Sequence, residues 1–420
     1  MLRVLYLVLC ALPLAGFATE TVAMGLPTAL AQVLATDPQV RAAQAQEAAA
    51  LANVKRLRSR LFPTLQLQAD SGSSDEVEDR VTLKRRTGQT SMALSWNLYN
   101  GGADFSEFEA AELELRTAQQ DVRRIREEVG ARIAKAWTQL VQQSRLEKMA
   151  TTQQAYVLGL MQKMQQQWAE GKISDVDRLQ GANAALQAQM GLIEAESARL
   201  GAQRQLEVIL GQAVDTAEAF NWAHVVLAES LDTTANYSVQ VATLRAQAQQ
   251  ARVVHLASAL APKLDLSLRK TLDNRVSPPT SIQPIQSWTL GLNWQIPLGG
   301  EPIHQHEQTL QRALAARFEA ENITQQVSAQ WAADYATLTG LRQTLVTMDN
   351  QAMQAQKIMD ASTLLFESGR RNLQQLIQMS ETHHEVMRRR VSEQGRQDLT
   401  LIQLLSLRGD LLIAIFGGLQ

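Results

Sequence analysis

Two stretches of the chain decide its fold: SMALSWNLYNGG at residues 91–102 and SWTLGLNWQIPLGG at residues 287–300. In both, bulky apolar side chains occupy every second position and the run ends at a Gly-Gly pair. Small or polar residues fill most of the positions between them. This alternation predicts two β-strands, each with one apolar face and one polar face. Gly101 and Gly299 open the two pairs, 198 residues apart.

The same separation recurs along the chain, which indicates an internal duplication. LFPTLQL at 61–67 matches LAPKLDL at 260–266, WTQL at 137–140 matches YATL at 335–338, and WAEG at 168–171 matches FESG at 366–369. Matches in one order at offsets of 198 or 199 residues are hard to obtain by chance. The sequence is therefore two copies of one structural unit.

Each copy is predicted to contain a proline-terminated helix, a β-hairpin and a long helical hairpin. In the first copy an N-terminal segment and helix occupy 19–60, with the helix expected from Leu26 to about Leu61, the hairpin 61–100 and the helical hairpin 101–211. A connector follows at 212–237. The second copy has its helix at 238–261, its hairpin at 262–299, its helical hairpin at 300–416 and a tail at 417–420. Apolar residues recur every seven positions from Phe108 to Ala136 and from Leu338 to Phe366, which predicts supercoiled helices.

The chain's first residues resemble an export signal. Arg3 precedes an apolar run from Val4 to Phe17, and small residues favour cleavage after Ala18, so we assign 1–18 as a signal peptide. Cys10 is the only cysteine and lies inside that segment. The mature chain would then have none, which excludes disulfides and thiol catalysis.

Composition argues against an enzyme or a nucleic-acid-binding protein. The net charge is −2, so no polycationic face for nucleic acid is expected. The histidine pairs His304/His306 and His383/His384 lack the i, i+4 spacing that aims two imidazoles at one metal. We therefore predict no catalytic residue, no cofactor and no metal site.

The strand pattern predicts a membrane sheet. The residues expected to face lipid are Met92, Leu94, Trp96, Trp288, Leu290, Leu292 and Trp294, whereas Ser95, Thr289 and Asn293 are expected to face water. Ser73–Thr87 and Asn274–Pro284 are expected to be extracellular hairpin tips. An ordinary soluble hairpin packed on a core is the alternative. Four strands per chain cannot close a barrel, so copies must share one, as a dimer of eight strands or a trimer of twelve. A water-filled lumen favours three.

The duplicated order of helix, hairpin, Gly-Gly break and heptad helix resembles the TolC family of outer-membrane efflux and secretion channels. The resemblance runs from about Leu26 to Leu412. It implies a mainly α protein with a shared twelve-stranded trimeric β-barrel in the outer membrane and an α-barrel in the periplasm. It also implies a periplasmic adaptor and an inner-membrane ABC or proton-driven transporter as partners. From Phe366 onward the sequence looks closest to the type I secretion branch.

The same resemblance implies a gate at two periplasmic turns. Its candidate residues are Gly171, Asp177, Phe366, Gly369, Arg371, Gln375 and Gln378. The family often has acidic residues where Gln375 and Gln378 stand, and a tyrosine where Phe366 stands, so this chain departs from the pattern. Asp177 and Arg371 are expected to lie close together and to hold the coils closed.

A different class of protein also fits part of the sequence. A periplasmic coiled-coil adaptor or scaffold without a pore would explain the export signal and the heptads. It would not explain two amphipathic hairpins that carry tryptophan.

Overall fold

The computed structural model describes residues 25–78, 81–214, 216–222, 225, 227–257, 260–277, 286–295, 297–368 and 370–417. The signal peptide assigned to 1–18, with Cys10, lies outside the described residues, as do Gly369 and the end of the tail.

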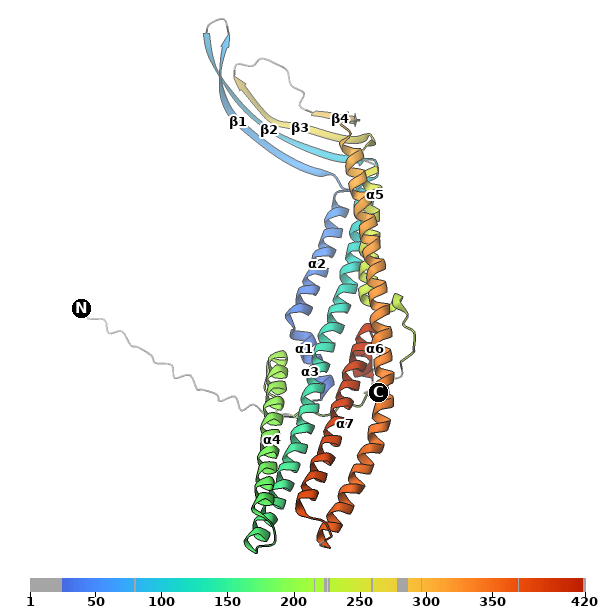
Figure 1. Cartoon of the computed structure of the whole chain (residues 1–420). Helices are drawn as coiled ribbons and strands as arrows, with labels where there is room; N and C mark the ends of the chain where they lie inside the picture. The colour runs from blue at the N-terminus through green and yellow to red at the C-terminus, as the bar shows by residue number, and fades with distance from the viewer. Residues whose placement is uncertain are drawn as a thin grey trace, which may run out of the picture. The chain divides into compact units, whose positions relative to one another are not determined.

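Helices make up most of the described chain (Figure 1). The first copy contains α1 (Leu26–Thr36), α2 (Pro38–Ser59), α3 (Ala103–Ala169) and α4 (Asp175–Leu210). The second contains η1 (Thr233–Ala235), α5 (Tyr237–Ala257), α6 (Glu301–Glu367), α7 (Leu373–Arg408) and α8 (Leu411–Gly417). Both α3 and α6 have 67 residues, and both α4 and α7 have 36. The duplication read from the sequence is thus repeated in the helices.

The first helix differs from the expectation of one helix to Leu61. The chain breaks between α1 and α2, where the Asp37 side chain accepts hydrogen bonds from the backbone N–H groups of Gln39 and Val40. Pro38 occupies the first helical position, where its missing N–H costs nothing. An N-cap followed by proline starts a new helix, so the Ala-rich run forms two helices.

The second helical hairpin also ends in a break that the sequence did not predict. Gly409 lies between α7 and α8 with φ of 82°, a conformation that favours glycine. A Cβ at this position would come within 2.9 Å of the Tyr237 ring. The side chain of Asn236 donates to the Leu407 carbonyl at 2.6 Å, which fixes the end of α7 beside the start of α5.

Four antiparallel strands form one sheet in the order β1 (Thr64–Glu78), β2 (Val81–Tyr99), β3 (Lys263–Ser277) and β4 (Gln286–Asn293). Figure 1 shows the sheet curving along its strands. Strands β1 and β2 pair as far as Glu78 and Val81, so the hairpin reverses within the tip expected at Ser73–Thr87, but most of that range is paired strand and not loop. Of the second expected loop, 278–285 lies outside the described residues. Strand β4 ends at Asn293, so Trp294 follows the strand rather than belonging to it.

The chain divides into two compact units, and α3 and α6 contribute to both. One unit comprises Met1–Gln32, Ile133–Trp222 and Met348–Gly395; the other comprises Val33–Arg132, Ala223–Thr347 and Arg396–Gln420. In each unit α3 and α6 bury several of their heptad positions, among them Val129, Ala136, Leu338 and Ala352. The sequence pattern therefore found the packed faces of these helices.

Within the described residues, no single helix is long and apolar enough to cross a membrane. Helices α7 and α8 satisfy that length and composition only when counted together across their 112° bend.

Candidate functional site

The sheet register gathers apolar side chains into rows that cross all four strands. Leu65, Leu94, Leu268 and Trp288 are successive partners in one row. The next row toward the helices joins Trp96, Leu266 and Leu290. Because side chains alternate along a strand, these rows lie on one face of the sheet. Leu290 is 53% exposed and Leu292 is 71% exposed, so none of the described elements covers this face there.

Polar side chains form the rows on the opposite face. Thr64, Ser95, Ser267 and Thr289 are successive partners, and the Thr64 and Ser95 hydroxyls lie 2.8 Å apart. One row further, the Asn97 amide donates to the Asp265 carboxylate at 2.8 Å. The sheet therefore has one apolar and one polar face across four strands, which is more than the alternation of each strand alone could establish.

Each repeat has a tryptophan at the junction between sheet and helix. The Trp96 indole N–H donates to the Leu61 carbonyl at 3.0 Å, and the Trp294 indole N–H donates to the Leu260 carbonyl at 3.1 Å. The two hydrogen bonds are equivalent in the duplication. They fix the ring orientation at the edge of the apolar face, a role that strand alternation did not predict.

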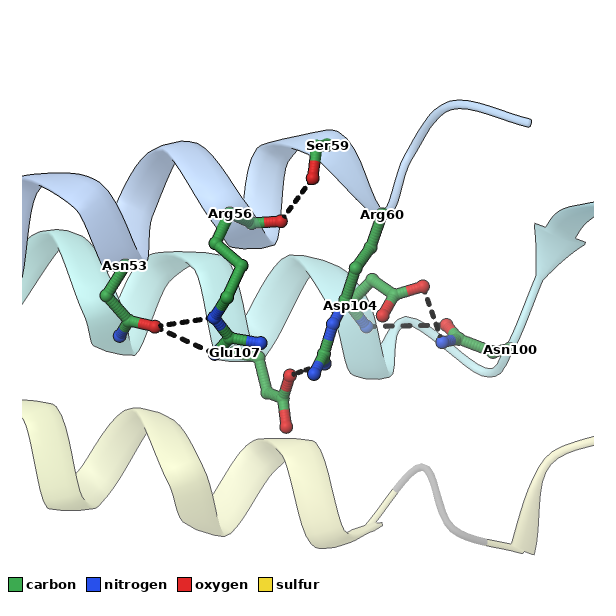
Figure 2. A network of polar contacts seen from close by, with 7 residues as sticks. All are labelled: Asn53, Arg56, Ser59, Arg60, Asn100, Asp104 and Glu107. Atoms are coloured by element: carbon green, nitrogen blue, oxygen red, sulfur yellow. Dashed lines mark hydrogen bonds and ion pairs between the residues drawn. The ribbon is translucent and has the colours of Figure 1, made fainter. Parts of the chain in front are cut away.

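A polar network joins α2 to α3 where the first hairpin leaves the helices (Figure 2). The Arg60 guanidinium binds the Glu107 carboxylate at 2.7 Å. The Asn100 side chain accepts from the Asp104 backbone N–H at 3.4 Å and donates to the Asp104 carboxylate at 2.7 Å, which caps α3. The helices on both sides of β1 and β2 are thereby held together at their ends.

The first turn between long helices is closed by backbone and capping interactions. Gly171 has φ of 72°, a left-handed conformation. The Lys172 N–H donates to the backbone carbonyl of Gln167, in the last turn of α3, at 2.8 Å, as in a Schellman motif. Ser174 then caps α4. Its hydroxyl accepts from the Asp177 N–H at 3.1 Å, while the Asp177 carboxylate accepts from the Ser174 N–H at 3.1 Å. The candidate gate residue Asp177 thus belongs to a capping box.

The second turn repeats that backbone pattern with different side chains. The Arg370 N–H donates to the Leu365 carbonyl at 2.9 Å, and the Asn372 side chain accepts from the Gln375 N–H at 2.9 Å. Gln375 is therefore the counterpart of Asp177 at the third helical position. Arg371 donates to the hydroxyl of Ser362, which is only 1% exposed. Within the chain, Arg371 and Asp177 have these separate partners and the structure does not join them to each other.

A hydrophobic cluster lies beneath both turns. Its buried members are Val157, Leu160, Met164, Ala184, Leu373, Leu376 and Ile377. Phe366 packs against this cluster, and the Lys163 ammonium lies 5.8 Å from the centre of its ring. Gln378 is exposed on α7. The cluster joins the two hairpins at their ends through side chains far apart in the sequence.

Glu127 is a buried carboxylate that the sequence analysis missed. It is 5% exposed, and its side chain accepts from the Leu412 N–H at the start of α8 at 3.4 Å. Burial raises its pKa to about 7, with a contribution from Asp410 and against the opposing effect of the α8 backbone N–H groups. Glu127 lies outside the heptad positions of α3, so periodicity places it on the exposed face. Only the packing of α8 buries it.

Among the described residues, no three histidine, cysteine, aspartate or glutamate side chains converge as a metal site requires.

The sequence matches one protein-family model, and the fold is similar to several solved structures. Residues 29–212 match the family model described as outer membrane efflux protein. No curated protein matches the sequence significantly. The fold is similar to that of CusC, with a TM-score of 0.82 at 14% identity over 94% of both chains. It is also similar to the CmeC outer membrane channel of Campylobacter jejuni, with a TM-score of 0.81 at 12% identity over 92% of this chain and 86% of that one. For the outer membrane protein VceC of Vibrio cholerae the TM-score is 0.78 at 16% identity, over 91% and 96%.

Proposed function

We propose that this protein is the outer-membrane exit duct of a tripartite export system, because residues 29–212 match the outer membrane efflux protein family model and the fold is similar to that of solved outer-membrane channels. The match and the fold both support the TolC-family resemblance of the sequence. In the proposed assembly the sheet lies in the outer membrane and the long helices extend into the periplasm.

The observation that carries this proposal is the two-faced sheet. Its apolar rows are exposed and its polar rows contain hydroxyl, amide and carboxylate groups, which suits lipid on one side and water on the other. A soluble sheet would pack its apolar face on a core. The alternative of an adaptor or scaffold without a pore gives no reason for such rows.

The open edges of the sheet favour an oligomer. Within the described residues, strands β1 and β4 each have one side without a partner strand. Unpaired backbone groups in hydrocarbon cost several kcal/mol each, so the edges must be paired between copies. Three copies give twelve strands, and a barrel of that size leaves room for a water-filled lumen. We infer a homotrimer on this ground.

The exposed stripe on α4 supports the same assembly. Leu179, Leu186, Ile193 and Leu200 recur every seven residues, and all four are exposed in the single chain. Such a stripe is suited to coiled-coil packing against a helix of another copy. The proposed partners beyond the trimer are a periplasmic adaptor and an inner-membrane transporter.

A pair of adjacent substitutions tests the membrane sheet. Leu290→Arg should reduce the yield of heat-resistant trimer in the outer-membrane fraction, because arginine on the lipid face costs ~2–4 kcal/mol near mid-membrane. Thr289→Arg, on the opposite face, should leave trimer yield nearly unchanged and alter single-channel conductance in planar bilayers. Equal trimer yield from both variants would contradict the assignment of faces.

The direction of the barrel and the identity of the exporter need separate experiments. A tag inserted near Ser74 should be accessible on intact cells, since barrels keep their long hairpins outside. A tag that is accessible only after the outer membrane is opened would invert the topology. Copurification with an ABC transporter would assign the duct to type I protein secretion, whereas a proton-driven pump would assign it to small-molecule efflux.

A further inference from the structure

Lys270 is the one charged side chain on the apolar face of the sheet, among the sheet residues whose side chains are described. It follows Leu264, Leu266 and Leu268 at every second position of β3, and its register partners are Met92 and Gln286. It is exposed. The rows between Lys270 and the helices consist of leucine, methionine and tryptophan, and a cation at their border calls for a specific partner.

No partner for the Lys270 ammonium group occurs in the part of the chain that the structure describes. Lys270 has no ion pair or hydrogen bond there, and neither have the amide of Gln286 and the indole N–H of Trp288. Lys270 and Gln286 are partners in one row, and Trp288 lies in the adjoining row. Three hydrogen-bond donors thus lie together on the apolar face, and no acceptor from the described chain satisfies them.

A groove runs beside these donors. Its volume is about 560 Å³, and its apolar lining includes Leu65, Met92, Leu94, Leu268 and Trp288. Lys270 and Gln286 also line it, as do Arg269 and Ser287, which are register partners in a row of the opposite face. The groove therefore combines an apolar trough with a positive, donor-rich end, which matches an amphiphile with an acyl chain and an anionic head group.

The position of Lys270 along the strand fits such a head group. On the same face Leu264, Leu266 and Leu268 lie nearer the helices, while Ser71 and Gly88 occupy that face further from them. Beyond Lys270 the paired rows of this face contain small or polar residues, and Leu272, at the bulge of β3, is the one bulky apolar side chain among those described there. Tryptophan and lysine are the side chains suited to this boundary, where an apolar body meets polar head groups.

We propose that this groove is a binding site for an anionic phospholipid, with the phosphate on Lys270, Gln286 and Trp288 and an acyl chain along Leu94 and Leu268. The inference rests on the proposed function, because it requires the apolar face to contact lipid. The three proposed phosphate-binding side chains belong to the second repeat alone. At the positions equivalent to Lys270, Gln286 and Trp288, the first repeat has Ser71, Gly88 and Thr90.

The test measures lipid preference on the purified, delipidated full-length assembly. Dioleoyl phosphatidic acid, dioleoyl phosphatidylcholine and inorganic phosphate are added separately, and bound lipid is counted by native mass spectrometry. Wild type should bind phosphatidic acid about fivefold more tightly than phosphatidylcholine, the preference expected from one lysine at a membrane surface. Inorganic phosphate should not compete at equal concentration, since it lacks the acyl chain.

Three variants make the result specific. Lys270→Gln should lower the affinity for phosphatidic acid to that for phosphatidylcholine. Lys270→Arg should retain the fivefold preference for phosphatidic acid. Lys263→Gln is the matched control: Lys263 is an exposed cation on the same strand, but it pairs with Asn293 on the polar face. Loss of preference in Lys263→Gln as well would show a general effect of charge and overturn the proposal.

The remaining outcomes separate this inference from the proposed function. If wild type forms heat-resistant trimer in the outer-membrane fraction but shows no preference for phosphatidic acid, the lipid site is wrong and the membrane sheet stands. If inorganic phosphate competes as well as the lipid, the site binds a soluble anion and the proposal is overturned. If wild type is absent from the outer-membrane fraction, the proposed function itself fails.

Discussion

The two repeats agree in backbone and differ in side chains. Helices of 67 and 36 residues, indole hydrogen bonds at the strand ends and Schellman-type turns occur in both copies. At the sheet junction, however, the second copy has Leu298, Pro302 and Gln305 where the first has Asn100, Asp104 and Glu107. Leu298 is 98% exposed. The helices, indole hydrogen bonds and turns that both copies share belong to the common fold. The side chains that differ at the sheet junction are not required by that fold.

The same contrast occurs at the turns. Arg371 and Ser362 form a polar contact beneath the second turn, and their counterparts Ile173 and Met164 belong to the hydrophobic cluster beneath the first. Glu127 is buried under α8, whereas its counterpart Gln325 is exposed. One backbone is thus stabilised by different side chains, and substitutions can test whether the repeats are equivalent.

The largest effect is expected on the sheet. Leu94 and Leu292 are equivalent and both lie on the apolar face, so Leu94→Arg and Leu292→Arg should each cost ~2–4 kcal/mol if both lie near mid-membrane. The measurement is the yield of heat-resistant trimer on gels. Ser95→Arg and Asn293→Arg, on the polar face, are the matched controls and should assemble normally. A large loss in only one of the two leucine variants would show that the hairpins lie at different depths.

The next effect is a change in pH dependence at Glu127. Its folded pKa of about 7 is above the usual value, so the folded state binds the proton more tightly than the unfolded state does. The contribution of Glu127 to the free energy of unfolding is therefore most favourable below about pH 4.5. It falls by about 3 kcal/mol as the pH rises to 7 and above. Glu127→Gln removes the charge and should raise stability at pH 8 while changing little at pH 5.

Thermal unfolding followed by circular dichroism at both pH values measures this difference. Gln325→Glu is the matched control, because the added carboxylate at the equivalent position stays exposed and should leave the pH dependence unchanged. If wild type and Glu127→Gln unfold at the same temperature at pH 8, the folded state does not raise the pKa of Glu127, and the carboxylate is charged there without cost to stability.

A smaller effect is expected where the connector is attached. The Trp137 indole donates to the Glu218 carbonyl at 2.8 Å, and the Trp331 indole donates to the Glu229 carbonyl at 2.9 Å. Trp137→Phe and Trp331→Phe should each cost ~1–2 kcal/mol in unfolding free energy, for a lost hydrogen bond and some packing. Exposed Trp168 is the control, and Trp168→Phe should change stability by less than about 0.5 kcal/mol. An effect in one variant alone would show that only one half of the connector is held this way.

Much of the fold followed from periodicity, and much of the site did not. The alternation around Trp96 and the heptads from Phe108 and Leu338 predicted the strands and long helices, because each reports a face that is buried or paired along its own element. The sequence did not predict the row from Leu65 to Trp288, which depends on strand register. It also missed burial of Glu127 by α8 and the contact of Arg371 with Ser362, since both depend on segments distant in the chain or on the geometry of a turn.

The smallest effect, and the most specific, concerns the proposed gate. Asp177 and Arg371 each hold a turn within one chain, so their removal should loosen the helix ends by ~1 kcal/mol or less rather than disrupt the fold. Arg371→Ser and Asp177→Ala are expected to raise single-channel conductance in planar bilayers without changing trimer yield. Summed over the three copies of the proposed trimer, such small losses can shift an equilibrium between closed and open states.

Arg370→Ser is the matched control, because Arg370 is an exposed neighbour in the same turn. A rise in Arg371→Ser alone would assign closure to the second turn and its Ser362 contact. Conductance at the wild-type level in both Arg371→Ser and Asp177→Ala would leave the two residues with only the capping and turn contacts described above.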